Sequence, residues 1–251
     1  MPERLQKVLS RSGLSSRRGC ETIISEGRVT VNGIIAELGC SVDPGVDEIC
    51  VDGKRIQPPA RHVYIALNKP VGVISSLKSQ DGRPIVRDLV GHPGRLFPVG
   101  RLDVESEGLI LMTNDGELAN ILTHPRYSNE KEYRVLLNRS PDVKQIKAWR
   151  RGVVLPDGVR LKRAGCRVEG RGEDGAWLRI VLRQGRKRQI RETARALGLH
   201  VKKLIRIRIG GLWLGDLRPG EWRFLTKREV AILKKSEIVK RSQPSPRKES
   251  G

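Results

Sequence analysis

The chain has 251 residues, of which 49 are Lys or Arg and 28 are Asp or Glu, so its formal net charge is +21. This length allows one large or two smaller domains, and the positive excess favours polyanionic partners, because each phosphate that Lys or Arg neutralises releases condensed counterions. No apolar stretch approaches the roughly 18 residues that span a bilayer and the N-terminus lacks the apolar segment of a secretory signal, so we expect a cytoplasmic nucleic-acid-binding protein without a membrane partner.

Residues 1–57 have the pattern of a small compact module. Apolar residues recur at helical spacing from Leu5 to Leu9, and Gly13 suits the position just after the end of this helix. Ser15 or Ser16 can cap a second helix. Two dipeptides, Asn-Gly and Asp-Gly, follow between short apolar runs and predict two hairpin turns.

This module resembles the S-four-type RNA-binding domain, which is named after a ribosomal protein. The resemblance depends on the spacing Arg-Leu-x-Lys-x-Leu-x-x-x-Gly-x-x-Ser-Arg-Arg at residues 4–18 and Gly-x-Val-x-Val-Asn-Gly at residues 27–33. It implies an RNA ligand, with backbone contacts from basic residues at the first helix start and the second helix cap. The candidate RNA-binding residues are Arg4, Lys7, Arg17 and Arg18.

Two prolines at positions 58 and 59 predict a linker over residues 58–61, because proline cannot continue a sheet ladder and stiffens the connection. A larger domain is expected over residues 62–233. It begins with an apolar run at residues 63–67 that predicts a strand and stops at Asn-Lys-Pro-x-Gly, residues 68–72.

Residues 100–116 carry the most specific pattern of the chain. Asp103 follows a Gly-Arg-Leu lead-in, and an apolar run from Leu109 to Met112 comes within six positions. Asn114, Asp115 and a glycine then supply turn chemistry. The pattern predicts a short buried strand after a loop that displays Asp103.

The remaining segments mix predicted strands and helices without strict alternation. We expect an α+β fold whose central sheet is mainly antiparallel and flanked by helices. Residues 234–251 contain few apolar residues and many Lys, Arg, Ser and Pro, so we expect a disordered basic tail. The further predicted strands are 133–137, 153–155, 176–182 and 213–214, and the predicted helices are 117–123, 142–151 and 187–197.

Three segments together resemble the RNA pseudouridine synthases, in the branch that modifies ribosomal RNA (RsuA/RluB type). Residues 100–116 resemble the catalytic motif of that family, residues 131–135 its tyrosine motif, and residues 185–191 its third motif. The resemblance covers nearly the whole chain. It implies the same α+β fold and a reaction that converts one uridine to pseudouridine without a cofactor, a metal or an energy donor.

The resemblance also implies roles for individual side chains. Asp103 would be the catalytic carboxylate, and Tyr133 would stack on a base flipped out of the RNA. Arg191 is the expected ion-pair partner of Asp103, with Arg188 as the other candidate, because an arginine keeps a carboxylate ionised. Arg101 would fill the gap that the flipped base leaves, and Leu204 would line the base pocket. Whether Asp103 attacks the sugar, attacks the base or abstracts a proton stays open.

The expected partner is ribosomal RNA or a ribosome-assembly intermediate, bound by a monomer; the sequence does not identify the uridine or the ribosomal subunit. A non-catalytic assembly factor with the same fold is one alternative. A metal-dependent nuclease is another, because Asp103, Glu105, Glu107 and Asp115 are clustered acids. The four cysteines form no Cys-x-x-Cys pair, and the four histidines are not at metal-ligand spacing with them, so we expect no metal site and a reducing compartment.

Overall fold

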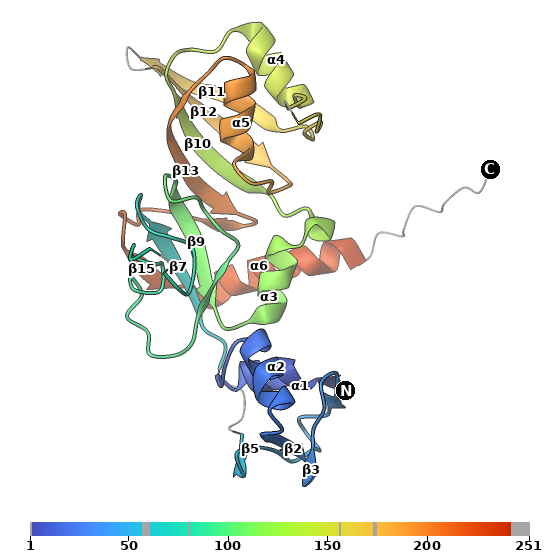
Figure 1. Ribbon diagram of the computed structural model, residues 1–251. Helices are drawn as coiled ribbons and strands as arrows, with labels where there is room; N and C mark the ends of the chain where they lie inside the picture. The colour runs from blue at the N-terminus through green and yellow to red at the C-terminus, as the bar shows by residue number, and fades with distance from the viewer. Residues whose placement is uncertain (1, 57–60, 80, 156, 173–174, 242–251) are drawn as a thin grey trace, which may run out of the picture. The chain divides into compact units, whose positions relative to one another are not determined.

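The computed structural model describes residues 2–56, 61–79, 81–155, 157–172 and 175–241, with side chains up to residue 235 (Figure 1). The chain divides into two compact units. The first extends to His62 and also includes His92–Arg95, and the second comprises Val63–Gly91 and the chain from Leu96 onward. The predicted linker at 58–61 lies outside the described residues, except for Arg61.

The first unit contains two helices and short strands around one core. The core holds Leu5, Leu9, Cys20, Ile24 and Val29, which are all at most 2% exposed. Its elements are β1 (Glu3–Arg4), α1 (Leu5–Arg11), α2 (Arg17–Ser25), β2 (Val29–Val31), β3 (Ile34–Ile35), β4 (Ser41–Val42), β5 (Ile49–Val51) and β6 (Lys54–Arg55). A four-stranded sheet has the order β3-β2-β5-β6, and β1 pairs with β4.

Local signals determine the turns and caps of this unit. The hydroxyl of Ser16 accepts a hydrogen bond from the amide of Gly19 at 2.9 Å, so Ser16 is the N-cap of α2. Asn32 and Asp52 both have positive φ and are each followed by a glycine with positive φ. These two dipeptides form the predicted turns of the hairpins β2-β3 and β5-β6.

The second unit contains a nine-stranded sheet among its described residues, with the main order β11-β12-β10-β13-β9-β7-β15. The neighbours are antiparallel apart from β13 and β9, which are parallel, so the prediction of a mainly antiparallel sheet is confirmed. The strands are β7 (Tyr64–Lys69), β8 (Phe97–Val99), β9 (Glu107–Thr113), β10 (Lys131–Leu137), β11 (Gly165–Gly172), β12 (Gly175–Leu182), β13 (Val201–Ile209), β14 (Leu212–Trp213) and β15 (Trp222–Phe224).

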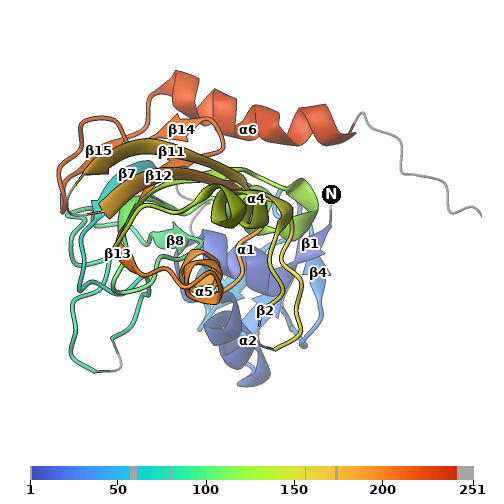
Figure 2. The same ribbon diagram turned by 90° about the horizontal axis from the view of Figure 1, so that it is seen from above.

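Helices cover both faces of this sheet (Figure 2). The helices α4 (Val143–Arg151) and α5 (Gln189–Ala196) pack on one face of β10, β12 and β13, through Trp149, Ile190 and Ala194. The helices α3 (Gly116–Thr123) and α6 (Lys227–Arg241) pack on the other face beside β7 and β9, through Leu118 and Leu233. A short 3-10 helix, η1 (Pro125–Tyr127), follows α3.

The parallel contact between β9 and β13 depends on a glycine. Gly108 has φ +108°, and a Cβ atom added there would lie 2.3 Å from the carbonyl oxygen of Arg206. Only glycine allows this close approach of the two backbones. The contact brings the middle of β13 next to the start of β9, immediately after the Asp103 loop.

Two predictions differ from the structure. Residues 153–155 do not form a strand, because Val154 makes only an isolated bridge with Arg160. The disordered tail was predicted from residue 234, but α6 continues to Arg241. Residues 234–241 are mostly good helix formers, which accounts for the longer helix. Residues 242–251 of that tail lie outside the described residues. Within the described chain, no helix combines the length and apolar character that crossing a bilayer requires.

Candidate active site

Asp103 lies in the loop that joins β8 to β9, and its backbone is held on both sides. The amide of Ser106 donates to the carbonyl of Asp103 at 3.0 Å, which closes a turn. On the other side, the amide of Leu102 donates to the hydroxyl of Ser75 at 3.1 Å, and that hydroxyl donates back to the Leu102 carbonyl at 2.9 Å. The carboxylate itself makes no hydrogen bond or ion pair with any other described residue. Its position is therefore set by the backbone, and its oxygens are available to a substrate.

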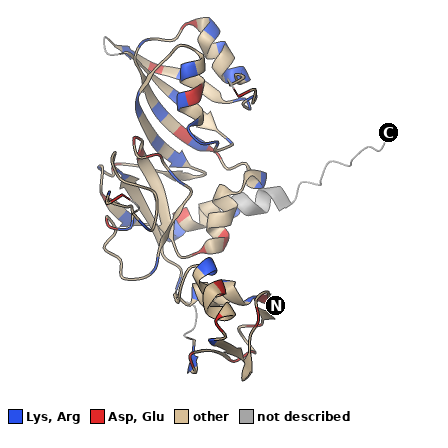
Figure 3. Cartoon of the chain, in the orientation of Figure 1, with Lys and Arg blue, Asp and Glu red and all other residues tan. Residues whose placement is uncertain are grey.

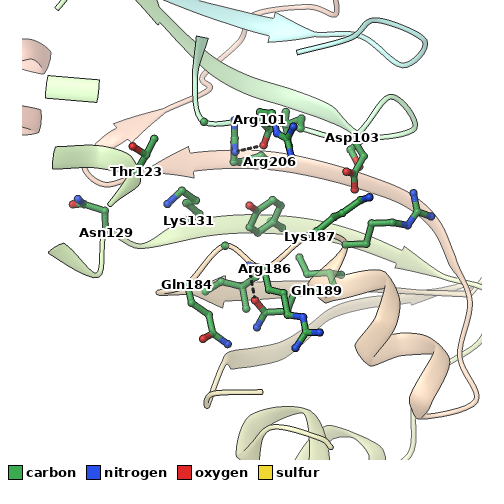
Figure 4. Close-up of a pocket in the computed structure, with 18 of the residues that line it drawn as sticks. Arg101, Asp103, Thr123, Asn129, Lys131, Gln184, Arg186, Lys187, Gln189 and Arg206 are labelled. Atoms are coloured by element: carbon green, nitrogen blue, oxygen red, sulfur yellow. Dashed lines mark hydrogen bonds between the residues drawn. The ribbon is translucent and has the colours of Figure 1, made fainter. Parts of the chain in front are cut away.

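A cavity of about 340 Å³ opens beside this carboxylate (Figure 4). The structure brings five of the predicted site residues together around it, namely Arg101, Asp103, Tyr133, Arg188 and Leu204. Seven cationic side chains line this active-site cavity, and Asp103 is the one carboxylate among the described lining residues. The cavity therefore combines a single carboxylate with a strongly positive wall, which suits a polyanionic ligand.

Tyr133 and Leu204 form the apolar wall of the cavity. Tyr133 is 9% exposed on β10 and Leu204 is 6% exposed on β13. The register of the two strands pairs Tyr133 with Arg206 and Val135 with Leu204, so these side chains point to the same face. Both belong to the core cluster that also contains Leu102 of the Asp103 loop.

The predicted direct ion pair between Arg191 and Asp103 is not formed in the described structure. Arg191 instead lies near Glu105, with 3.7 Å between its Nε and Glu105 Oε2, and its Nη2 donates to the Glu105 carbonyl at 3.1 Å. Glu105, two residues beyond Asp103, is therefore the carboxylate that contacts the guanidinium of Arg191. Arg188, the other candidate, also pairs with Glu105, at 3.1 Å.

Arg191 still acts electrostatically on Asp103. Burial lowers the pKa of Arg191, while the nearby carboxylates of Glu105 and Asp103 favour its charged form. Its Nη1 also donates to the carbonyl of Val201 at 3.3 Å. The arginine therefore connects α5, β13 and the Asp103 loop without lining the cavity.

Two cations that the sequence interpretation missed face the same cavity. Arg206 is 1% exposed, and its guanidinium donates to the carbonyls of Leu109 at 2.7 Å and Arg101 at 3.3 Å. Its Nη2 has no hydrogen-bond partner among the described residues. Lys131 is partly buried and donates to a carbonyl, that of Leu122, at 3.4 Å. Neither cation has a carboxylate partner within the described chain, so their positive charge is not compensated internally.

These surroundings lower the pKa of Lys131 to about 8, mainly by burial and also by the like charge of Arg206. Burial also lowers the pKa of Arg206. A buried charge without a partner is costly, and an anion in the cavity offsets that cost.

Lys69, in the Asn-Lys-Pro-x-Gly segment, supports the loop from behind. Its Nζ is fully buried and donates to the carbonyls of Pro70 and Val73, both at 2.8 Å. Burial lowers the pKa of Lys69 to about 8, whereas Asp103 and Glu107 favour its charged form. The Nζ of Lys69 also donates to the carbonyl of Val104 at 3.5 Å, so this motif contacts the loop that carries Asp103.

The four predicted RNA-binding residues of the first unit differ in whether their side chains already have partners. Arg4 donates to the carbonyl of Gly39, and Lys7 pairs with Glu3 at 2.9 Å. Arg17 and Arg18 are exposed at the start of α2, and their side chains have no partner among the described residues. They are the better placed pair for phosphate contacts.

Three of the four clustered acids that suggested a nuclease as the alternative function have separate structural partners. Glu105 pairs with Arg188, Glu107 pairs with Lys203 at 2.9 Å, and Asp115 caps α3 by accepting from the amide of Glu117. Glu107 begins β9 and Asp115 lies two residues beyond its other end, so the length of the strand, roughly 20 Å at about 3.3 Å per residue, separates them. Within the described residues, no three His, Cys, Asp or Glu side chains gather as metal ligands.

Comparison with known proteins gives consistent matches. The family model described as RNA pseudouridylate synthase matches residues 63–196, and the S4 domain model matches residues 3–47. An uncharacterized RNA pseudouridine synthase of Aquifex aeolicus is 43% identical over 249 residues, which is 96% of this chain and 97% of that protein. The ribosomal large subunit pseudouridine synthase B of Bacillus subtilis is 38% identical over 235 residues, with 92% of this chain and 96% of that protein covered. A crystal structure of a pseudouridylate synthase has a TM-score of 0.65 and 29% identity, and covers 92% of this chain and 99% of that one.

Proposed function

Because the chain belongs to the RNA pseudouridylate synthase family, we propose that it converts a specific uridine of ribosomal RNA to pseudouridine with Asp103 as the reacting carboxylate. The observation that carries this proposal is the free Asp103 carboxylate, fixed by its backbone in a cavity whose other charged lining residues are all cations. The name of the Bacillus subtilis relative supports ribosomal RNA as the substrate.

The reaction isomerises the nucleotide, so no atom is gained or lost. The bond between N1 of uracil and C1′ of ribose breaks, the uracil turns, and C5 bonds to C1′ while the proton of C5 leaves and N1 is protonated. Asp103 attacks the sugar, attacks the base or removes a proton, and each role requires an ionised, unpaired oxygen. The apolar surface of Tyr133 and Leu204 receives the flipped base, and Arg101 fills the space that the base leaves.

The cations of the cavity complement this chemistry. Uracil carries negative charge when its bond to the sugar breaks, and a cation fixed near that charge stabilises it without reorganisation. Among the described cations that line the cavity, Lys131 and Arg206 are the two that are partly or fully buried and have no carboxylate partner, so we assign them this role.

We further propose a division of labour along the chain. Residues 1–57 act as the RNA-binding domain, and residues 62–233 act as the catalytic domain. The protein works as a cytoplasmic monomer on ribosomal RNA or on an assembly intermediate.

The direct test is to map pseudouridine in the ribosomal RNA of a deletion strain. We expect at least one position to lose the modification and to regain it when the wild-type chain is supplied. An unchanged map in both ribosomal subunits would contradict the proposed substrate.

Replacing Arg17 and Arg18 together by Ala is expected to weaken RNA binding about tenfold and to reduce its salt dependence, because two phosphate contacts are lost. The single-turnover rate at saturating RNA should stay within about twofold of wild type. Salt-titrated binding measures the first effect. Unchanged affinity at every salt concentration would refute the role of these arginines.

The rate of pseudouridine formation is expected to fall above about pH 8, where Lys131 loses its proton. Lys69 titrates in the same range, so the wild-type profile alone does not identify the group. In Lys131→Arg the guanidinium stays charged, and the alkaline fall should shift upward by more than one pH unit. Single-turnover rates between about pH 6 and 10 measure this, and an unshifted profile would exclude Lys131 as its cause.

A further inference from the structure

A second cavity, of about 700 Å³, lies outside the active site in the same unit. Five arginines line it together with two glutamates, and we call it the arginine groove. Its charged lining residues are Arg150, Arg163, Arg167, Arg179, Arg183, Glu130 and Glu132. Figure 3 shows how frequent Lys and Arg are on the strands of this part of the sheet.

On β10 and β12, the arginine groove and the active-site cavity are lined by side chains of opposite faces, whereas Cys166 and, on α4, Arg150 line the groove from the cavity's side of the sheet. On β10, Lys131 and Tyr133 line the active-site cavity, whereas Glu132 between them lines the groove. On β12, Leu182 faces the cavity and Val181 faces the groove. Because successive side chains of a strand point to opposite faces, β10 and β12 contribute side chains to both spaces.

The two spaces meet at Arg183. This arginine directly follows β12 and lines both the cavity and the groove. Arg183 is therefore a guanidinium that an RNA backbone could contact both at the active-site cavity and at the groove.

The two glutamates of the groove are already neutralised. Glu130 accepts from Arg183 at 3.1 Å and from Arg208 at 3.0 Å, and Glu132 accepts from Arg208 at 2.8 Å and from Arg179 at 3.3 Å. The guanidinium groups of Arg208 and Arg183 lower the pKa of Glu130. These acids hold the floor of the groove together and leave its rim positive.

The remaining arginines provide the excess charge. Arg163 and Arg167 are exposed and have no side-chain partner among the described residues. Arg150, on α4, donates one hydrogen bond from its Nε to the carbonyl of Cys166 at 2.8 Å, and its Nη atoms have no partner among the described residues. Three guanidinium groups that line one concave surface complement the negative charge of a phosphodiester chain.

We propose that the arginine groove binds the phosphodiester backbone of the RNA whose uridine enters the active-site cavity. This inference rests on the proposed function for the identity of the RNA. The occupant is RNA because the charge is complementary to phosphate and the groove is continuous with the candidate active site at Arg183. The contacts position the substrate and carry no base specificity.

The test compares a groove variant, Arg163→Ala with Arg167→Ala, against a control variant, Lys227→Ala with Arg228→Ala. The control residues are exposed at the start of α6, line none of the cavities described above, and carry the same total charge. Both variants are titrated with labelled, in-vitro-transcribed ribosomal RNA of each subunit over a range of salt concentrations. Circular dichroism checks that both remain folded, as expected for exposed side chains.

We expect the groove variant to bind RNA about tenfold more weakly than the control, with a salt slope reduced by about 1.5 to 2. Its single-turnover rate at saturating RNA should stay within about twofold of wild type. Equal affinities and equal salt slopes for the two variants would overturn the proposal, including the case in which the groove binds an acidic protein. Failure of the wild-type enzyme to modify either RNA would reject the proposed function instead. The binding comparison would still show whether the arginine groove binds RNA.

Discussion

Replacing Asp103 by Asn should reduce pseudouridine formation by at least about 10³-fold, because the amide can neither attack as a nucleophile nor accept a proton in the reaction. The substitution is nearly isosteric. The carboxylate has no hydrogen bond or ion pair within the described chain, so the fold should be unaffected. RNA affinity should be equal or slightly higher, because one negative charge leaves a cavity lined by cations. Single-turnover assays and RNA titrations measure the two effects separately.

The matched control is Asp216→Asn, which removes an exposed carboxylate from the same unit and has no side-chain partner among the described residues. It should behave as wild type in both assays. A rate for Asp103→Asn within about tenfold of wild type would rule out the catalytic assignment. If Asp103→Asn also restored growth of a deletion strain as well as wild type, the protein would serve assembly through binding alone.

Replacing Arg191 by Met should lower the single-turnover rate by about 10²-fold or more while RNA affinity changes less than about threefold. Two of the contacts that would be lost, to the carbonyls of Glu105 and Val201, fix the Asp103 loop against α5 and β13. The positive charge near Asp103 would be lost as well. Turnover therefore depends on this arginine even though it lies outside the cavity lining.

Arg195→Met on the same helix is the control, because Arg195 is exposed and pairs only with Glu192 in the described structure. Arg188→Met separates the two arginines that share Glu105. Arg188 lines the cavity, and its side chain makes no hydrogen bond to a backbone carbonyl of the described chain, so its loss should weaken binding more than turnover. A larger rate loss for Arg188→Met than for Arg191→Met, or rates within twofold of wild type for Arg191→Met, would contradict our assignment.

Local sequence signals predicted the parts of the fold that depend on neighbouring residues. The cap at Ser16 and the hairpin turns at Asn32 and Asp52 follow from turn and cap chemistry that acts over a few residues. The start of α6 was missed although a comparable signal exists there. Thr226 and Glu229 form a capping box, with the Thr226 amide donating to Glu229 at 2.8 Å.

Contacts between distant segments could not be predicted in this way. The parallel pairing of β13 with β9 depends on the backbone approach at Gly108, almost a hundred residues away in sequence from Arg206. The strand from Val201 to Ile209 was not among the predicted strands. Leu204 was expected in the pocket only from the family resemblance, and Arg206 on the same strand face was not predicted.

The sequence predicted which residues gather at the candidate site better than it predicted how they pair. Asp103 and Tyr133 were identified from their motifs, and both line the cavity. The sequence could not show that Glu105 takes the place of Asp103 beside Arg191, because side-chain distances of a few ångströms decide that pairing. It also gave no sign that Lys131 lacks a carboxylate partner in the described chain.

The separate hydrophobic cores of the two units have a consequence for how the enzyme handles a very large substrate. Once either unit has engaged an RNA, the covalent chain confines the other nearby, at an effective concentration on the order of millimolar. Avidity then allows each contact to be weak by itself. Weak individual contacts exchange rapidly, so the modified product can depart stepwise, and tight capture does not have to slow turnover.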